Sequence, residues 1–155
     1  RMLDGKPVVV NGDGSSLWTI THVNDFAVGL VGLLGHPGAI GRAVHITGQE
    51  APSWDQIHRC IGMALGVAPR IVHATSEQIA AVDPDFGAGL LGDKRYSMLF
   101  DNSLIRSLVP AFRQSISFAE GMQRSVAAAE RDATLRSTRP EINQLIERVL
   151  SAVVA

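Results

Sequence analysis

The sequence is poor in several residue types that other classes of protein need. Cysteine occurs once, at Cys60, so the chain cannot form an internal disulfide, and a reducing cytoplasm is its expected location. Aromatic residues make up 5% of the chain, and Tyr96 is its single tyrosine. Apolar runs are shorter than the roughly 20 residues that span a bilayer, so no membrane partner is expected.

Neither sign of charge predominates in this chain. Fourteen Lys and Arg residues face fifteen Asp and Glu residues, giving a net charge of −1. The basic residues are scattered, whereas a nucleic-acid surface needs clustered basic residues, so no nucleic-acid partner is expected. The five histidines include no pair at metal-ligand spacing, and one cysteine cannot complete a thiolate site, so no metal is expected.

The length and apolar content suit a single folded unit. With 155 residues, 46% of them hydrophobic, residues 1–155 can bury a core as one domain. We expect the core to lie in residues 6–112, with C-terminal helices over residues 117–153.

The chain is organised around residues 12–27, which follow the β-branched run Lys6–Val10. Asn11 to Gly14 supply residues that tolerate positive φ, which predicts a hairpin turn. Apolar residues then alternate over residues 18–22, which predicts a strand. Asn24 or Asp25 can cap a helix that should begin at about Asp25.

The remaining patterns alternate between short strands and helices. Further strands are predicted over residues 42–47, 70–74 and 96–99, and helices over residues 53–65, 75–82, 102–108, 117–131 and 138–153. Gly66 should end one helix, and residues 83–92, rich in glycine, should form a mobile loop. The total of about six helices and five short strands predicts an α/β fold.

The motif KPVVVNGDGSSLWTITHVNDFA, from Lys6 to Ala27, resembles a segment of the extended short-chain dehydrogenase/reductases, the NAD-dependent epimerase/dehydratase family. AVHITG at residues 43–48 and Asp101-Asn102-Ser103 are similar to later motifs of that family, in the same order. The resemblance implies that the chain is the C-terminal, substrate-binding half of a Rossmann-type protein that lacks its cofactor-binding half.

Cofactor and partners follow from this resemblance. It implies that the intact protein uses NAD or NADP as a reductase, epimerase or dehydratase, and that this chain alone binds no cofactor. Its partners would be a small-molecule substrate and either the missing N-terminal half or a second copy. The start of the chain resembles the last turn of a helix inside a longer protein.

The residues that perform hydride transfer in the family have no counterpart here. Its Tyr-x-x-x-Lys pair is absent, because Phe100 stands four residues after Tyr96, so no catalytic residue is assigned. Residues 35–41 match G-x-x-G-x-x-G, but they follow a helical pattern and precede a strand. A pyrophosphate site needs the opposite order, so a helix end and loop are expected.

The chain departs from the family at three positions. Asn11 stands where an aromatic residue stacks on the base, and Trp18 where an arginine pairs with phosphate. Trp offers one neutral donor and a large apolar face, and Leu104 likewise replaces a lysine. Val10, Asn11 and Trp18 are therefore predicted to bind a substrate less charged than a nucleotide-sugar, with residues 83–92 as a possible lid. Trp18 could equally be a core residue packed under the neighbouring helix.

Two other functions remain open from the sequence. The chain could be a non-catalytic binding or regulatory module with the same fold, or a self-contained small interaction protein. His45 and His73 lie on apolar segments and are expected to be hydrogen-bonded core residues. Asp25 is interpreted as a helix cap rather than as an acid or base.

Overall fold

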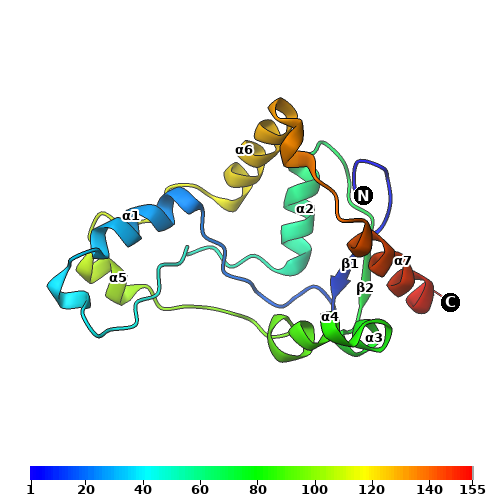
Figure 1. Ribbon diagram of the computed structural model, residues 1–155, viewed down its shortest axis with the longest axis horizontal. Helices are drawn as coiled ribbons and strands as arrows, with labels where there is room; N and C mark the ends of the chain where they lie inside the picture. The colour runs from blue at the N-terminus through cyan, green and yellow to red at the C-terminus, as the bar shows by residue number, and fades with distance from the viewer. Residues whose placement is uncertain (155) are drawn as a thin grey trace.

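The computed structural model describes residues 1–154 and shows an elongated α/β molecule (Figure 1). Its helices α1 and α5 lie at one end, and strands β1 and β2 with helices α3, α4 and α7 lie at the other. The elements are β1 (Val8–Asn11), α1 (Val23–Leu33), α2 (Trp54–Ala64), β2 (Ile71–Ala74), α3 (Ser76–Val82), α4 (Pro84–Gly89), α5 (Ser103–Leu108), α6 (Phe118–Arg131) and α7 (Pro140–Val154). The α/β class is confirmed, with seven α-helices and two strands among these residues.

The two strands form a parallel sheet. Val8 pairs with Ile71 and Asn11 with Ala74, so the chain after β1 crosses over through α2 before β2 begins. Gly12 and Gly14 have φ values of 65° and 75°, as the turn residues predict. The predicted hairpin is wrong, because the turn leads the chain away from β1 instead of back along it.

Three predicted strands form no regular ladder. Residues 18–22 and 96–99 meet only in a single bridge between Trp18 and Met98, and Leu17 bridges Ser53 on the other side. Residues 42–47 are not assigned to a strand, and no backbone hydrogen bond joins residues 43–46 to the rest of the described chain. Alternation of apolar and polar residues identifies an extended segment, but a strand also needs a neighbouring backbone to pair with.

Local capping signals are confirmed at several helix ends. Ser53 and Thr75 form capping boxes with Gln56 and Gln78. Ser117 caps α6 by accepting a hydrogen bond from the Glu120 N–H. Gly66, with a φ of 69°, follows the end of α2 as expected.

Helix α1 begins earlier than predicted and uses a different cap. It starts at Val23, and the His22 imidazole accepts a hydrogen bond from the Asn24 N–H at 3.2 Å. Asp25 is 3% exposed and lies inside the helix, so its interpretation as the N-cap is wrong. The capping rule favours Asn and Asp over His on average, but here the His22 ring is placed to accept.

Residues 83–92 are helical, so the prediction of a loop is wrong. Asp83 caps α4 by accepting a hydrogen bond from the Phe86 N–H, and a π-helical turn, Leu90–Lys94, follows α4 directly. Leu90 is 7% exposed because it packs in the core beside the sheet. Burial of this side chain outweighs the weak helix propensity of the glycines.

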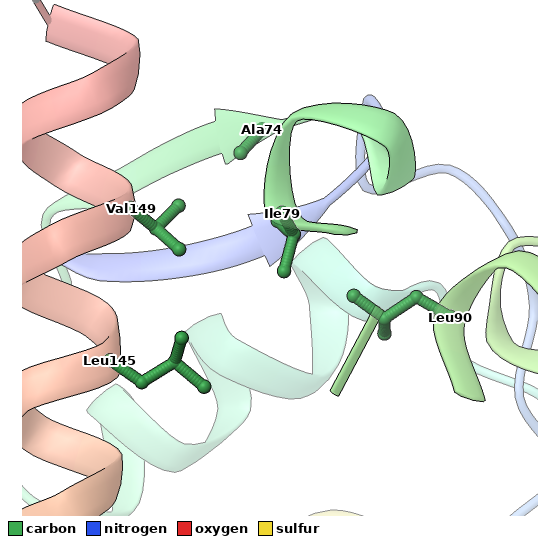
Figure 2. Packing of buried hydrophobic residues seen from close by; sticks show 5 residues of the cluster. All are labelled: Ala74, Ile79, Leu90, Leu145 and Val149. Atoms are coloured by element: carbon green, nitrogen blue, oxygen red, sulfur yellow. The ribbon is translucent and has the colours of Figure 1, made fainter. Parts of the chain in front are cut away.

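The main core lies where α7 packs on the sheet. Figure 2 shows Leu145 and Val149 projecting from α7 toward Ile79 and Leu90, with Ala74 of β2 close by. A second core, made by Ile105, Val109 and Phe112, lies at the opposite end against α1. Each core is therefore local to one end of the elongated molecule.

Helix α1 packs against the second core through its small residues. A Cβ atom on Gly29 would lie 2.5 Å from Ile46 Cγ2, and one on Gly32 would lie 2.4 Å from Val109 Cγ1. Leu33 packs on the second core, but Val31 within the helix and Leu34 directly after it are 66% and 71% exposed. The structure therefore presents an apolar face on α1.

Asp25 connects α1 to the segment before α6. Its carboxylate accepts hydrogen bonds from the Ser115 N–H and Oγ at 3.0 and 2.5 Å and from the Ile116 N–H at 3.1 Å. Burial by itself raises the pKa of Asp25, but the hydrogen bonds from Ser115 and Ile116 outweigh it, so the pKa lies below the usual value of 3.8. Asp25 therefore stabilises a long-range contact.

Candidate functional site

A cavity of about 280 Å³ lies between the parallel sheet and α7. Its walls come from β1, α2, α3, α4, the π-helical turn and α7, and include Val9, Ile79, Leu90, Leu145, Ile146 and Val149. Four of these side chains also belong to the main core, as Figure 2 shows for Ile79, Leu90, Leu145 and Val149. The cavity is thus a gap in the main core whose surface is mostly apolar.

Asn11 introduces a polar group into the wall at the carboxyl end of β1. Its Oδ1 accepts a hydrogen bond from Ser76 Oγ at 2.6 Å. The Gly12 N–H donates to the Ala74 carbonyl at 2.8 Å, which extends the strand pairing into the turn. Because the carboxyl ends of parallel strands are the usual place for ligands in α/β proteins, Asn11 is well placed to contact one.

Two tryptophans adjoin the cavity near Lys94. The rings of Trp18 and Trp54 are 5.4 Å apart at an angle of 34°, and Trp54 lines the cavity. Trp54 Nε1 donates to the Lys94 carbonyl at 3.3 Å, and Lys94 Nζ lies 5.4 Å from the centre of the Trp18 ring. The aromatic pair therefore positions the end of the π-helical turn at the cavity.

The structure places the three predicted pocket residues at different depths. Val10, 1% exposed, and Asn11 both line the cavity. Trp18 is not part of the lining but packs behind Trp54. Trp18 is half-buried and packs on Trp54 of α2, so it is not a core residue under the helix that follows it, and its contact with a substrate stays a prediction.

Sequence reasoning did not identify Trp54, Phe86 or Lys94 as neighbours of this cavity. Trp54 lay in the helix predicted over residues 53–65, which gave no reason to separate it from the core. Phe86 and Lys94 lay in or next to the predicted loop, and Phe86 is 46% exposed in α4. Only the packing of this segment beside β1 brings them to the site.

The turn after β1 lies against a small charged cluster. Asp55 Oδ1 lies 2.8 Å from His73 Nε2, and Asp55 Oδ2 accepts from Arg59 Nη2 at 2.8 Å. Gly14 has a φ of 75°, which favours glycine, and a Cβ atom there would lie 2.2 Å from Asp55 Oδ1, so the Asp55 side chain would have to move. The cluster fixes the turn against α2 and β2.

The expectation that His45 and His73 are core residues is wrong. His73 keeps a side-chain exposure of 42% in its pair with Asp55. His45 is exposed and packs edge-on against Phe100, with ring centres 4.9 Å apart. Both segments bury only one face, and these side chains lie on the other.

Cys60 and the acidic residues offer little reactive chemistry. Burial, with a smaller contribution from the charge of Glu50, raises the pKa of the Cys60 thiol. The pKa of Asp13 is lowered because Ser15 donates from both its hydroxyl and its N–H to this carboxylate. Across residues 1–154, no three His, Cys, Asp or Glu side chains are grouped closely enough to hold a metal.

Residues 35–41 do not have the geometry of a dinucleotide site. They follow the end of α1, contain the 3₁₀ turn Pro37–Ala39 and lead into the extended residues 42–47. Gly35 and Gly41 have φ values of 73° and 71°. Because no α-helix begins directly after these glycines, they present no helix N-terminus to a pyrophosphate.

The helices of residues 1–154 are also too short or too polar to cross a bilayer.

The chain is similar to known enzymes over most of its own length. No family model matches it. It is 28% identical over 112 residues to 2'-dehydrokanamycin reductase of Streptomyces kanamyceticus, which covers 71% of this chain and 31% of the reductase.

Solved structures of UDP-glucuronic acid 4-epimerase from Bacillus cereus have the same fold over a partial region. The complex with NAD matches with a TM-score of 0.57 and 21% identity, covering 79% of this chain and 32% of the epimerase chain. A variant in complex with NAD and UDP-4-deoxy-4-fluoro-glucuronic acid matches with a TM-score of 0.61 and 18% identity, covering 84% and 37%.

These findings confirm the resemblance inferred from the sequence motifs. The chain has the α/β fold of part of the epimerase chains. It spans about a third of the length of the reductase and of the epimerases.

Proposed function

We propose that this chain is the substrate-binding part of an NAD(P)-dependent oxidoreductase or epimerase of the extended short-chain type. Its substrate would be less charged than a nucleotide-sugar, and its location would be the cytoplasm. The observation that carries the proposal is the apolar cavity at the carboxyl end of β1, with Val10 and Asn11 in its wall and Trp18 behind it. Similarity to a reductase and to epimerases supports the reaction class.

In this proposal, hydride transfer and substrate binding belong to two different parts of a protein. NAD or NADP would supply the hydride chemistry from a part outside these residues. The groups in this chain would bind and orient the substrate: the apolar walls exclude water, and Asn11 offers its amide. No residue of this chain is assigned a proton-transfer step.

The exposed face of α1 supports a partner for the chain. Val31 lies on this face and Leu34 directly follows the helix, and both are exposed. Residues 43–46 lie extended nearby with their backbone groups unpaired within the described chain. An unpaired extended segment beside an apolar helix face is suited to packing against another sheet. We assign this surface to contact with the cofactor-binding half or with a second copy.

The function is tested by calorimetric titration of the intact polypeptide that contains this chain with NADH and NADPH. Binding of at least one nucleotide is expected. When a carbonyl substrate is supplied, the bound nucleotide should be oxidised, which is measured as a fall in absorbance at 340 nm. Failure to bind either nucleotide would contradict the proposed function and favour a non-catalytic binding module.

A further inference from the structure

The cavity between β1 and α7 is large enough for a ring system. A closed apolar cavity of about 150 Å³ lined by Leu, Ile and Phe stays dry and binds benzene. The cavity here is half open to solvent and, at about 280 Å³, has nearly twice that volume. Its walls could therefore surround two fused rings or one substituted ring.

The polar groups in the lining are few. His58 Nδ1 lies 2.8 Å from the Trp54 carbonyl, and since a carbonyl only accepts, Nδ1 carries the proton and Nε2 is the acceptor of the neutral ring. Asn11 uses Oδ1 to bind Ser76, and its Nδ2 donates no hydrogen bond within the described chain. Lys94 is the one permanent cation in the lining. This set suits one acceptor or anionic group on a mostly apolar molecule.

Lys94 lines the cavity and keeps its side chain partly exposed, and its Nζ also lies 5.4 Å from the centre of the Trp18 ring. Its Nζ lies 3.5 Å from Asp93 Oδ2, and the two side chains are 42% and 46% exposed. An ion pair this exposed contributes little to stability, so a carboxylate seated in the cavity could replace Asp93 as the partner. A diphosphate would bring at least two negative charges to a site with this single cation.

We propose that the cavity binds a substrate with one or two apolar rings and a single carboxylate, with the rings between β1 and α7 and the carboxylate at Lys94. This inference rests on the proposed function and adds the substrate class. Burial of the rings supplies most of the affinity, and Lys94 supplies the orientation.

The test uses 2-naphthoate as the probe and the full chain as the protein. Trp18 and Trp54 are the only tryptophans in the sequence, and both adjoin the cavity, so their fluorescence reports occupancy. We expect saturable quenching by 2-naphthoate, with calorimetry giving one site per chain. The neutral 2-naphthalenemethanol should bind about tenfold more weakly, because a charge-assisted hydrogen bond is lost at a half-exposed site.

Two lysine variants form a matched pair, since Lys6 and Lys94 are the only lysines. Lys94→Met should lower the affinity for 2-naphthoate to that for the neutral probe, whereas Lys6→Met should leave it unchanged. Asp93→Asn should raise the affinity severalfold because it removes the competing carboxylate. Equal binding of both probes to the unmodified chain, or tighter binding of uridine diphosphate, would overturn the proposal.

A third variant tests the place of binding. Ile142 lines the cavity from α7 and is 37% exposed, so a larger side chain can be accommodated without refolding the core. Ile142→Trp should abolish binding of 2-naphthoate by filling the volume. Calorimetry is the readout for this variant, because the new tryptophan alters the fluorescence. Undiminished binding would show that the probe lies elsewhere and would overturn the proposal.

The two proposals can fail separately. Binding of NADH or NADPH by the intact polypeptide without any binding of 2-naphthoate would overturn the substrate class and leave the enzyme function standing. Binding of 2-naphthoate at Lys94 without binding of either nucleotide would support the cavity site and contradict the enzyme function.

Discussion

The two ends of the molecule differ in how far they bury the apolar side chains of their helices. At the sheet end, α7 turns its large residues inward, so that Val149 is 2% exposed and Leu145 is 6% exposed. At the other end, α1 turns Gly29 and Gly32 inward and leaves Val31 and Leu34 exposed. Within this chain α7 buries several large side chains, whereas α1 buries its glycines and, in part, Leu33.

The difference distinguishes packing that is complete within the chain from packing that is not. A surface helix normally turns its widest apolar stripe toward the core. Helix α1 instead uses its glycines to approach Ile46 and Val109 closely, and this leaves its wider stripe for another surface. The sheet end is therefore expected to bind its ligand without a partner, while the exposed face of α1 is expected to be covered by one.

The largest expected effect tests whether the two ends unfold together. Ile105 is fully buried in the core next to α1, and Leu145 is its counterpart beside the sheet. Ile105→Ala and Leu145→Ala should each lower the free energy of unfolding by about 2–5 kcal/mol, through lost burial and the cavity left behind. Urea titration followed by circular dichroism measures both. A single shared transition is expected, and two separate transitions would show that the ends are independent.

Asp25→Ala should have the next largest effect, at the α1 end. It removes the acceptor of three hydrogen bonds from Ser115 and Ile116 and should cost about 2–3 kcal/mol, because buried donors are left without partners. Asp4→Ala, on an exposed residue, is the control and should leave the free energy of unfolding unchanged.

The same carboxylate should make stability depend on pH. Because its folded pKa lies below 3.8, ionisation favours the folded state. This contribution is complete above the unfolded pKa and is lost as the pH falls through the folded pKa. Asp25→Asn should therefore lose less stability than the unmodified chain between pH 5 and about pH 2, as measured by urea titration at each pH. An unchanged slope would contradict this role.

Glycine substitutions give a smaller effect with opposite signs at two sites. Gly32→Ala should destabilise by about 1–2 kcal/mol, because its Cβ would approach Val109 and force α1 away from the core. Gly89→Ala, in α4 with open space around it, should instead stabilise by about 0.5–1 kcal/mol through reduced backbone entropy. Thermal unfolding measures both. If the Gly32→Ala protein were as stable as the unmodified chain, α1 would have to pack loosely on the second core.

The smallest effect on stability should come from the exposed face of α1. Val31→Lys should change the free energy of unfolding by less than about 0.5 kcal/mol, because the side chain is already in water. It should, however, lower self-association in sedimentation and reduce binding of a hydrophobic dye. Leu135→Lys, at a similarly exposed position in a 3₁₀ turn, is the matched control. An equal response of both variants would contradict a specific interface on α1.

Prediction from the sequence succeeded where the signal was local. The caps at Ser53, Thr75 and Ser117 and the positive φ at Gly12 and Gly14 depend on a few neighbouring residues, and all are confirmed. Strands were overpredicted because alternation indicates an extended segment but not its pairing. The glycine-rich residues 83–92 were taken as a loop because burial of Leu90 is not visible locally.

The candidate site was only partly visible in the sequence. Val10, Asn11 and Trp18 were found by resemblance and lie in or beside the cavity. Trp54 and Lys94 come from residues far along the chain and could not be placed beside them by any local pattern. Their positions depend on where α2 and the π-helical turn pack against β1.

The sequence by itself determined the α/β class, the helix caps and the glycine turn after β1, because each depends on the conformational preferences of adjacent residues. Tertiary structure alone decided that β1 pairs with β2 in parallel, that Asp25 binds the segment before α6, and that α7 forms one wall of a half-open cavity beside Asn11. Those features depend on contacts between residues far apart in the chain, which form only when burial of apolar surface brings them together.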